Sequence, residues 1–135
     1  MKIGFSGTSE GMTDDQLYTV RQLVLRLKPE EIHHGDCVGA DYQFHCICQP
    51  AGIKIVIHPP MNDYRRAFCK GDIVLVPNHF LDRNHDIVKA TDHLIAAPNS
   101  MHEYTRSGTW ATVRYARYKK KPITLVFPNG SSKRD

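Results

Sequence analysis

Short segments rich in β-branched residues alternate with segments of helical periodicity along the whole chain. This order is typical of βαβ units, in which crossover helices join parallel strands. It predicts an α/β, three-layer Rossmann-like domain with a mostly parallel sheet and helices on both faces. We expect strands at residues 3–6, 31–34, 53–57, 93–97 and 123–127, and the last two helices at residues 80–89 and from residue 107.

Helix boundaries are clearest in the first third of the chain. Thr13 and Gln16 have the spacing of a capping box, and an apolar stripe then continues until Pro29, which cannot extend a helix. A second apolar stripe starts at Ala40 and ends at Gly52, which we expect to be its C-cap.

The later regions give weaker patterns. Residues 63–69 suit a helical turn, and residues 73–76 suit either a short strand or an extended loop. We expect one domain over residues 1–128 and a polar tail over residues 129–135.

Composition and charge limit the classes of protein to which this chain can belong. A chain of 135 residues, 41% of them hydrophobic, suits one globular domain. No apolar run approaches the roughly 20 residues that span a bilayer, so we expect a cytoplasmic protein without membrane contact. Lysine and arginine exceed aspartate and glutamate by 18 to 14, mostly in residues 114–121 and 133–134. Such clusters attract anionic ligands or nucleic acid, but they also occur on solvated helix ends.

Histidines and cysteines are close enough in sequence to raise a metal hypothesis. His33 and His34 are neighbours on a strand and should face opposite sides of the sheet, and Cys48 belongs to a buried helical stripe. We therefore predict neither a metal site nor a separate cofactor. His34 and His45 are expected near a ligand or within the core.

Three strand-to-helix loops carry the small and hydroxyl-bearing residues that phosphate binding requires. Glycine lets the backbone approach a phosphate, and free N–H groups at the start of the next helix favour an anion. Loops that follow parallel strands meet at one sheet edge, so we expect these three to converge on one ligand, although each glycine could serve only a tight turn. The residues are Gly7, Thr8 and Ser9 in the first loop, Gly35, Asp36 and Gly39 in the second, and Ser107, Gly108 and Thr109 in the third.

These loops, with two further motifs, resemble the SLOG superfamily of Rossmann-like proteins, which includes DprA, the LOG phosphoribohydrolases and the YpsA group. The resemblance spans most of the chain. It is carried by residues 4–8, residues 34–41 with His45, Arg83 with Asn84, residues 92–96 and residues 107–112. It implies a five-stranded core in the order 3-2-1-4-5, binding of nucleotides or nucleotide-derived molecules, and frequent assembly into homodimers or larger homo-oligomers.

The resemblance also implies roles for individual residues. Gly108 and Thr109 would hold a phosphate, with the first loop beside them and the second loop opposite. Asp36 would accept hydrogen bonds from ribose hydroxyls, unless it serves as a turn or cap residue. Arg83 would neutralise a phosphate and Asn84 would hold a backbone or ligand amide, although a structural role for Arg83 is the alternative.

The chain departs from the enzymatic branch of this superfamily at Thr112. LOG enzymes carry there a glutamate that supports cleavage of the N-glycosidic bond. A replacement acid or base would have to come from Asp36, Asp41 or Glu103, and Asp36 is the catalytic candidate.

Three functions therefore stay open. The leading hypothesis is the binding or sensing of a nucleotide, a cyclic nucleotide or an ADP-ribose derivative. An enzyme of N-glycosidic bonds, either a hydrolase or a deoxyribosyltransferase, is the second. Single-stranded DNA binding of the DprA kind, which the basic residues 114–121 would support, is the third. Base stacking could come from Tyr104, Tyr115 or Trp110, although Trp110 also suits the core.

Overall fold

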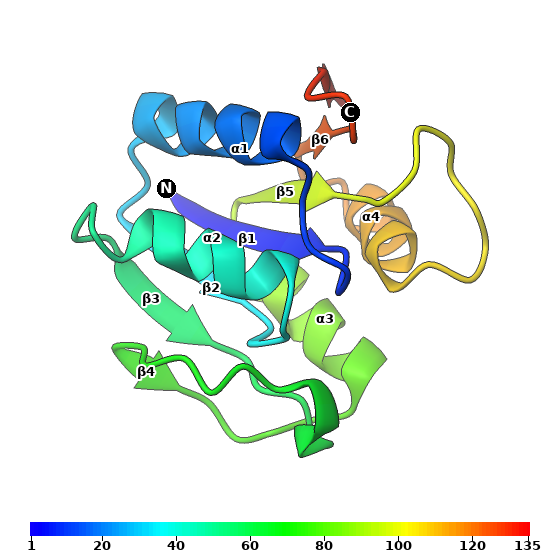
Figure 1. Cartoon of the computed structure of the whole chain (residues 1–135). Helices are drawn as coiled ribbons and strands as arrows, with labels where there is room; N and C mark the ends of the chain where they lie inside the picture. Colours follow the sequence, from blue (N-terminus) through cyan, green and yellow to red (C-terminus); the bar gives the residue numbers. More distant parts are fainter.

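The computed structural model describes all 135 residues, and its strands form one sheet in the order β4-β3-β2-β1-β5-β6-β7 (Figure 1). The strands are β1 (Lys2–Gly7), β2 (Glu31–His34), β3 (Lys54–Ile57), β4 (Ile73–Val74), β5 (His93–Ala97), β6 (Ile123–Val126) and β7 (Ser132–Arg134). The helices are α1 (Asp14–Leu27), α2 (Ala40–Cys48), the 3₁₀ turn η1 (Asp63–Arg65), α3 (Phe80–Ala90) and α4 (Gly108–Tyr118).

The sheet confirms the predicted topology and adds a strand at each edge. All neighbouring strands are parallel except β6 and β7, which are antiparallel. The five predicted strands correspond to β1, β2, β3, β5 and β6, and they lie in the expected order. The added strands are β4, which pairs with β3, and β7, which pairs with β6.

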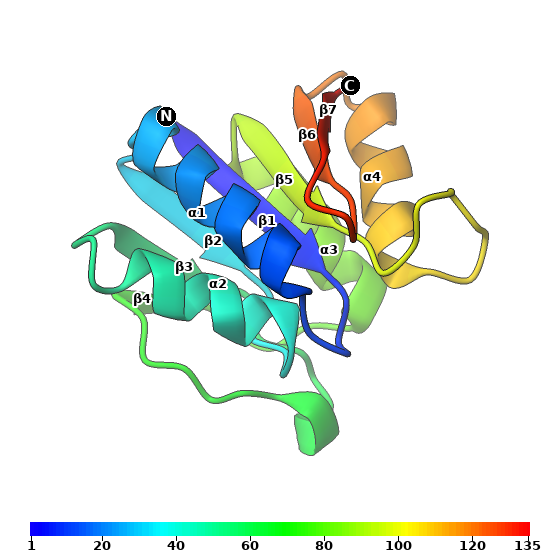
Figure 2. The same ribbon diagram turned by 45° about the horizontal axis from the view of Figure 1, so that its top comes forward.

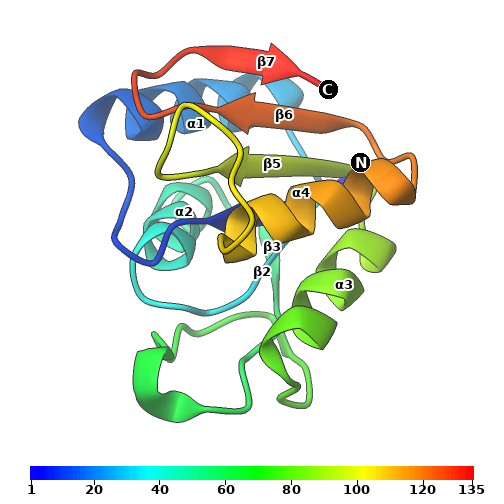
Figure 3. The same cartoon turned by 90° about the vertical axis from the view of Figure 1, so that its right-hand side faces the viewer.

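Helices cover both faces of the sheet, as the alternating pattern predicts. Figures 2 and 3 show α1 and α2 on one face and α3 and α4 on the other. The first face buries a core of 15 residues that includes Phe5 of β1 stacked on Phe44 of α2, with ring centroids 4.2 Å apart. The second face buries 8 residues, among them Trp110 and Val113 of α4. Trp110 is therefore a core residue, which is the alternative to base stacking that the sequence allowed.

Helix caps explain where the first and last helices begin. The Thr13 hydroxyl accepts the N–H of Gln16 at 3.1 Å, and the Gln16 side chain accepts the N–H of Thr13 at 3.0 Å. This is the predicted capping box, which satisfies two N–H groups that the helix itself leaves free. The side chain of Ser107 caps α4 in the same way by accepting the N–H of Trp110 at 3.1 Å.

Three expectations need correction. Helix α2 ends at Cys48, and Gly52 lies in the turn that follows rather than at the C-cap, with a φ of 72°. The predicted helical turn over residues 63–69 is only the short η1. Residues 129–135 are the predicted polar segment, but they are not a free tail, because Ser132–Arg134 pairs with β6.

The parallel arrangement decides where a ligand can bind. Strands β1, β2 and β5 all end at the same edge of the sheet, and the loops that follow them lie there together (Figure 3). None of the helices combines the length and the apolar character that crossing a membrane would require.

Candidate functional site

A cleft of about 870 Å³ opens at the edge of the sheet where β1 ends, between the first turns of α3 and α4. This volume lies within the roughly 300–1,000 Å³ of small-molecule sites. Eight of the eleven predicted binding residues line the cleft: Gly7, Thr8, Ser9, Arg83, Asn84, Ser107, Gly108 and Thr109.

The loop after β1 is held close to α2. The carbonyl of Thr8 accepts the N–H of Ala40 at 3.0 Å, and its hydroxyl accepts the N–H of Glu10 at 3.1 Å. Gly7 is required by this packing, because a Cβ there would lie 2.5 Å from the Cβ of Ala40. The hydroxyl of Thr8 still has its proton to donate into the cleft.

The first turn of α4 offers free donors to the same cleft. Ser107 caps the N–H of Trp110, whereas the N–H groups of Gly108 and Thr109 have no acceptor in the chain. A Cβ on Gly108 would lie 2.8 Å from the ring of Phe80, so only glycine leaves this approach open. Free N–H groups at a helix start, together with the helix dipole, favour an anion.

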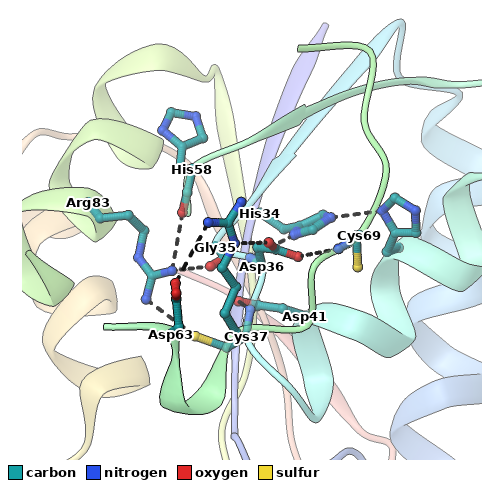
Figure 4. Close-up of polar contacts among 11 residues, drawn as sticks. His34, Gly35, Asp36, Cys37, Asp41, His58, Asp63, Cys69 and Arg83 are labelled. Carbon is teal, nitrogen blue, oxygen red and sulfur yellow. Dashed lines mark hydrogen bonds and ion pairs between the residues drawn. The ribbon is translucent and has the colours of Figure 1, made fainter. Parts of the chain in front are cut away.

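Helix α3 contributes a buried guanidinium and a free amide. Arg83 is 2% exposed and donates to the carbonyls of Gly35 and His58, and its Nη2 contacts Cys37 Sγ at 3.6 Å (Figure 4). Arg83 thus connects α3 to the loop after β2, which is the structural role given above as the alternative to phosphate binding. It also brings a positive charge to the cleft. The side chain of Asn84 makes no hydrogen bond within the chain and lines the cleft.

The loop after β2 does not deliver its predicted residues to the cleft. Gly35, Asp36 and Gly39 are absent from the lining. Gly39 instead allows close contact with the first loop, because its φ is 88° and a Cβ would lie 2.4 Å from the carbonyl oxygen of Ser9.

Asp36 is fully buried, and both of its carboxylate oxygens accept hydrogen bonds from other residues of the chain. One accepts the N–H of Cys69 at 2.9 Å and the other accepts from Arg66 Nε at 3.0 Å (Figure 4). Its φ of 56° is the left-handed conformation that aspartate tolerates in turns. The structural alternative for Asp36 therefore holds: this carboxylate anchors residues 66–69, and nothing in the geometry supports the expected hydrogen bonds to a ribose or a catalytic role.

Removing this anchor should destabilise the fold. We expect Asp36→Ala to lower the free energy of unfolding by about 3 kcal/mol, because the guanidinium of Arg66 and the N–H of Cys69 lose their acceptor. Urea unfolding of the two proteins measures the difference. Asp63→Ala is the matched control, because Asp63 is exposed and lies 3.9 Å from Arg66, so its loss should be below about 1 kcal/mol. Equal losses for both variants would contradict the assigned role.

Asp41 is the carboxylate that the structure places in the cleft. It stands in the first turn of α2, is 7% exposed, and accepts the N–H of Cys37 at 3.2 Å. Desolvation raises the pKa of Asp41 to about 6, although the nearby Arg83 and the backbone N–H groups of Cys37 and Gly35 oppose this shift. Glu103, the third candidate acid or base, does not line the cleft and pairs with Arg114 at 3.1 Å.

Several residues that line the cleft belong to no motif by which the sequence could have marked them as binding residues. Arg65 and Arg106 bring positive charge to the rim, and Arg65 also donates to Ser9 Oγ at 3.1 Å. Phe80 and Tyr64 add aromatic surface, and these residues are 50% and 84% exposed. Only position in three dimensions distinguishes these side chains from other exposed arginines and aromatics. Of the three aromatics considered for base stacking, Tyr104 alone lines the cleft.

His34, His45 and Cys69 come together beside the anchor of Asp36. Their potential ligand atoms lie within 4.8 Å of one another. However, His34 Nδ1 accepts the N–H of Asp36 at 3.0 Å, which places the ring proton on Nε2. That N–H then donates to His45 Nδ1 at 3.0 Å, so neither facing nitrogen keeps a free lone pair. In this arrangement the two histidines and the backbone of Asp36 form a hydrogen-bonded chain.

Comparisons with solved structures support the fold. No protein-family model matches the chain, and no curated protein matches it by sequence. The molybdenum cofactor binding protein from the phototrophic bacterium Rippkaea orientalis aligns with a TM-score of 0.72 at 24% identity, over 93% of this chain and 76% of that one. The molybdenum cofactor carrier protein from Chlamydomonas reinhardtii aligns at 0.66 and 21%, over 92% and 74%.

A DNA-binding protein aligns over the same region. DNA processing protein A from Helicobacter pylori, described for its single-stranded DNA binding mode, has a TM-score of 0.63 at 17% identity, over 93% of this chain and 64% of that one. The sheet order, the two helical layers and the alignments with these neighbours all indicate the same fold. The chain has a Rossmann-like α/β fold, which it shares with these neighbours.

Proposed function

We propose that this protein binds a phosphate-bearing, nucleotide-type small molecule in the cleft between α3 and α4. One observation carries the proposal: the free N–H groups of Gly108 and Thr109 and the hydroxyl of Thr8 open on the same cleft. Together they form a set of donors that suits a phosphate group.

The rest of the cleft suits the remainder of such a ligand. Arg65 and Arg106 add positive charge at the rim, and the exposed rings of Phe80 and Tyr64 offer surfaces for a flat base. The structural neighbours described for the molybdenum cofactor and for single-stranded DNA are consistent with ligand binding on this fold.

The DNA hypothesis receives less support from the basic residues of α4. Arg114 and Arg117 both pair with Glu103, at 3.1 and 2.8 Å, and Arg117 also pairs with Asp135 at 2.7 Å. These contacts compensate the charges that would hold a DNA backbone. DNA binding would show a steep loss of affinity with salt, whereas a nucleotide in the cleft should show a shallow one.

Cleavage of an N-glycosidic bond is the second candidate function, and the position of Asp41 favours it. In this reaction Asp41 would take a proton from water, the water oxygen would bond to the sugar C1′, and the C1′–N bond would break. The base would leave with the bonding electrons and receive the proton. A carboxylate with a pKa of about 6 inside a cleft suits such proton transfer. Release of free base from nucleoside monophosphates would distinguish turnover from binding.

Mass spectrometry and calorimetry test the leading proposal. Small molecules released by denaturing the purified protein should include a phosphate-bearing compound with a heteroaromatic ring. Titration of the ligand-free protein should then show saturable heat with nucleoside monophosphates and weaker heat with inorganic phosphate. No binding of either probe would contradict the proposal. Self-association into dimers or larger assemblies stays a prediction, which light scattering on a sizing column can test.

A further inference from the structure

Asp41 is a buried carboxylate in a cleft that also offers free N–H groups, a hydroxyl and arginine side chains. It lies beside Gly35, because a Cβ on that residue would be 3.0 Å from Asp41 Oδ2 and would also meet the guanidinium of Arg83. Figure 4 shows Asp41 and Arg83 on either side of the loop after β2. Both charged groups lie beside Gly35 and line the cleft.

No side chain of the protein donates a hydrogen bond to Asp41. The Nη1 group of Arg83 donates to the carbonyls of Gly35 and His58, and its Nη2 group donates to the sulfur of Cys37. Only backbone N–H groups donate hydrogen bonds to the carboxylate of Asp41. A carboxylate has about four acceptor sites, so Asp41, which lines the cleft, keeps unused acceptor capacity.

This spare capacity restricts what can bind. A ligand that fills the cleft removes water from Asp41, and an acceptor that is buried without donors costs about 1–3 kcal/mol, more when it is charged. A ligand that brings donors avoids this cost. A ligand that brings an anion or a row of acceptors to Asp41 adds repulsion.

Resting on the proposed function, we propose that Asp41 determines specificity by accepting two hydrogen bonds from adjacent donors on the non-phosphate part of the ligand. Two sources share this chemistry. The first is the cis-diol of a ribose, and the second is the N1–H and amino edge of a guanine-type ring. The hydrogen bonding expected of Asp36 from the sequence is thereby assigned to a residue five positions later.

Calorimetric titration with GMP, 2′-deoxy-GMP and IMP tests this role and separates the two sources. 2′-Deoxy-GMP lacks one hydroxyl of the diol, and IMP lacks the amino group. We expect one of them to bind at least about tenfold more weakly than GMP, because charge-assisted hydrogen bonds contribute roughly 1.5–3 kcal/mol each. Weakened 2′-deoxy-GMP assigns the diol, and weakened IMP assigns the ring edge. Equal affinities, or GMP no tighter than inorganic phosphate, would overturn the role of Asp41.

Asp41→Asn is the matched variant. An amide can accept at only one of its two positions, so the variant should bind GMP and its weaker analogue within about twofold of each other. Its affinity for inorganic phosphate should not fall, because the substitution removes a negative charge from the cleft. Persistent discrimination in the variant would overturn the inference. If the wild type fails to bind inorganic phosphate and every nucleotide, the proposed function fails instead.

The wild type alone provides a second test if the variant does not fold. GMP and its weaker analogue carry the same phosphate, so the ratio of their affinities is insensitive to phosphate titration. Protonation of Asp41, whose pKa is about 6, should reduce this ratio as the pH falls from 8 to 5.5. A ratio that stays constant over this range would also overturn the inference.

Discussion

Gly108→Ala combined with Thr109→Val should lower the affinity for a nucleoside monophosphate by about 100-fold while the fold is retained. The alanine Cβ would crowd the ring of Phe80, which is half exposed and can move, and it would occupy the approach to the free N–H groups. The valine removes a hydroxyl donor that lines the cleft. Calorimetry measures the loss, and circular dichroism checks the fold.

Thr112→Val is the matched control for this double variant. Thr112 stands one turn later on α4, is 1% exposed, and donates to the carbonyl of Gly108 at 2.9 Å. It does not line the cleft, so removing its hydroxyl should leave nucleotide affinity within about twofold. Loss of affinity in the control but not in the double variant would contradict the phosphate site.

Acid should unfold this protein at a higher pH than most proteins of its size. Five buried histidines have a lowered pKa, chiefly because burial disfavours their charged form, and for His34 and His58 the values are about 3 and about 4. The others are His33, His45 and His93. Because the unfolded chain takes up these protons from about pH 6.5 downward while the folded chain does not, folding stability falls as the pH falls. One pKa unit corresponds to about 1.4 kcal/mol, so the combined loss by pH 4 should reach several kcal/mol.

Asp41 opposes this trend but does not cancel it. Its pKa is raised in the folded state, so it contributes stability below its unfolded value near 3.8, and this contribution is lost as the pH rises through about 6. Urea unfolding at pH 8, 6 and 4 measures the balance. The exposed His102→Gln variant should follow the wild-type curve. A free energy of unfolding that stays constant from pH 8 to pH 4 would contradict the account of the histidines.

Local sequence rules predicted the frame of the fold well. The capping box at Thr13 and the five main strands depend on interactions within short segments, and all are confirmed. The expectation that His33 and His34 face opposite ways is also confirmed, because His33 contacts His58 at 2.7 Å and His34 contacts His45 at 3.0 Å. The two edge strands have no clear sequence pattern, because β4 has only two residues and β7 is polar.

Side-chain direction in the loops could not be read from the sequence. Asp36 and Asp41 both follow β2 and both suit ligand binding by residue type, yet Asp36 turns toward residues 66–69 and Asp41 toward the cleft. The carboxylate of Asp36 contacts residues 66 and 69, and the neighbouring Gly35 contacts Arg83. Both depend on segments more than 25 positions away in the chain, so no local pattern reports them.

The most direct test of the phosphate site is a titration of the ¹⁵N-labelled protein with a nucleoside monophosphate, followed by amide NMR spectra. We predict that the largest shift changes occur at the amides of Gly108 and Thr109 and in the loop from Thr8 to Ser9. Changes confined to the exposed basic end of α4 and to β7, with those four amides unmoved, would contradict the account.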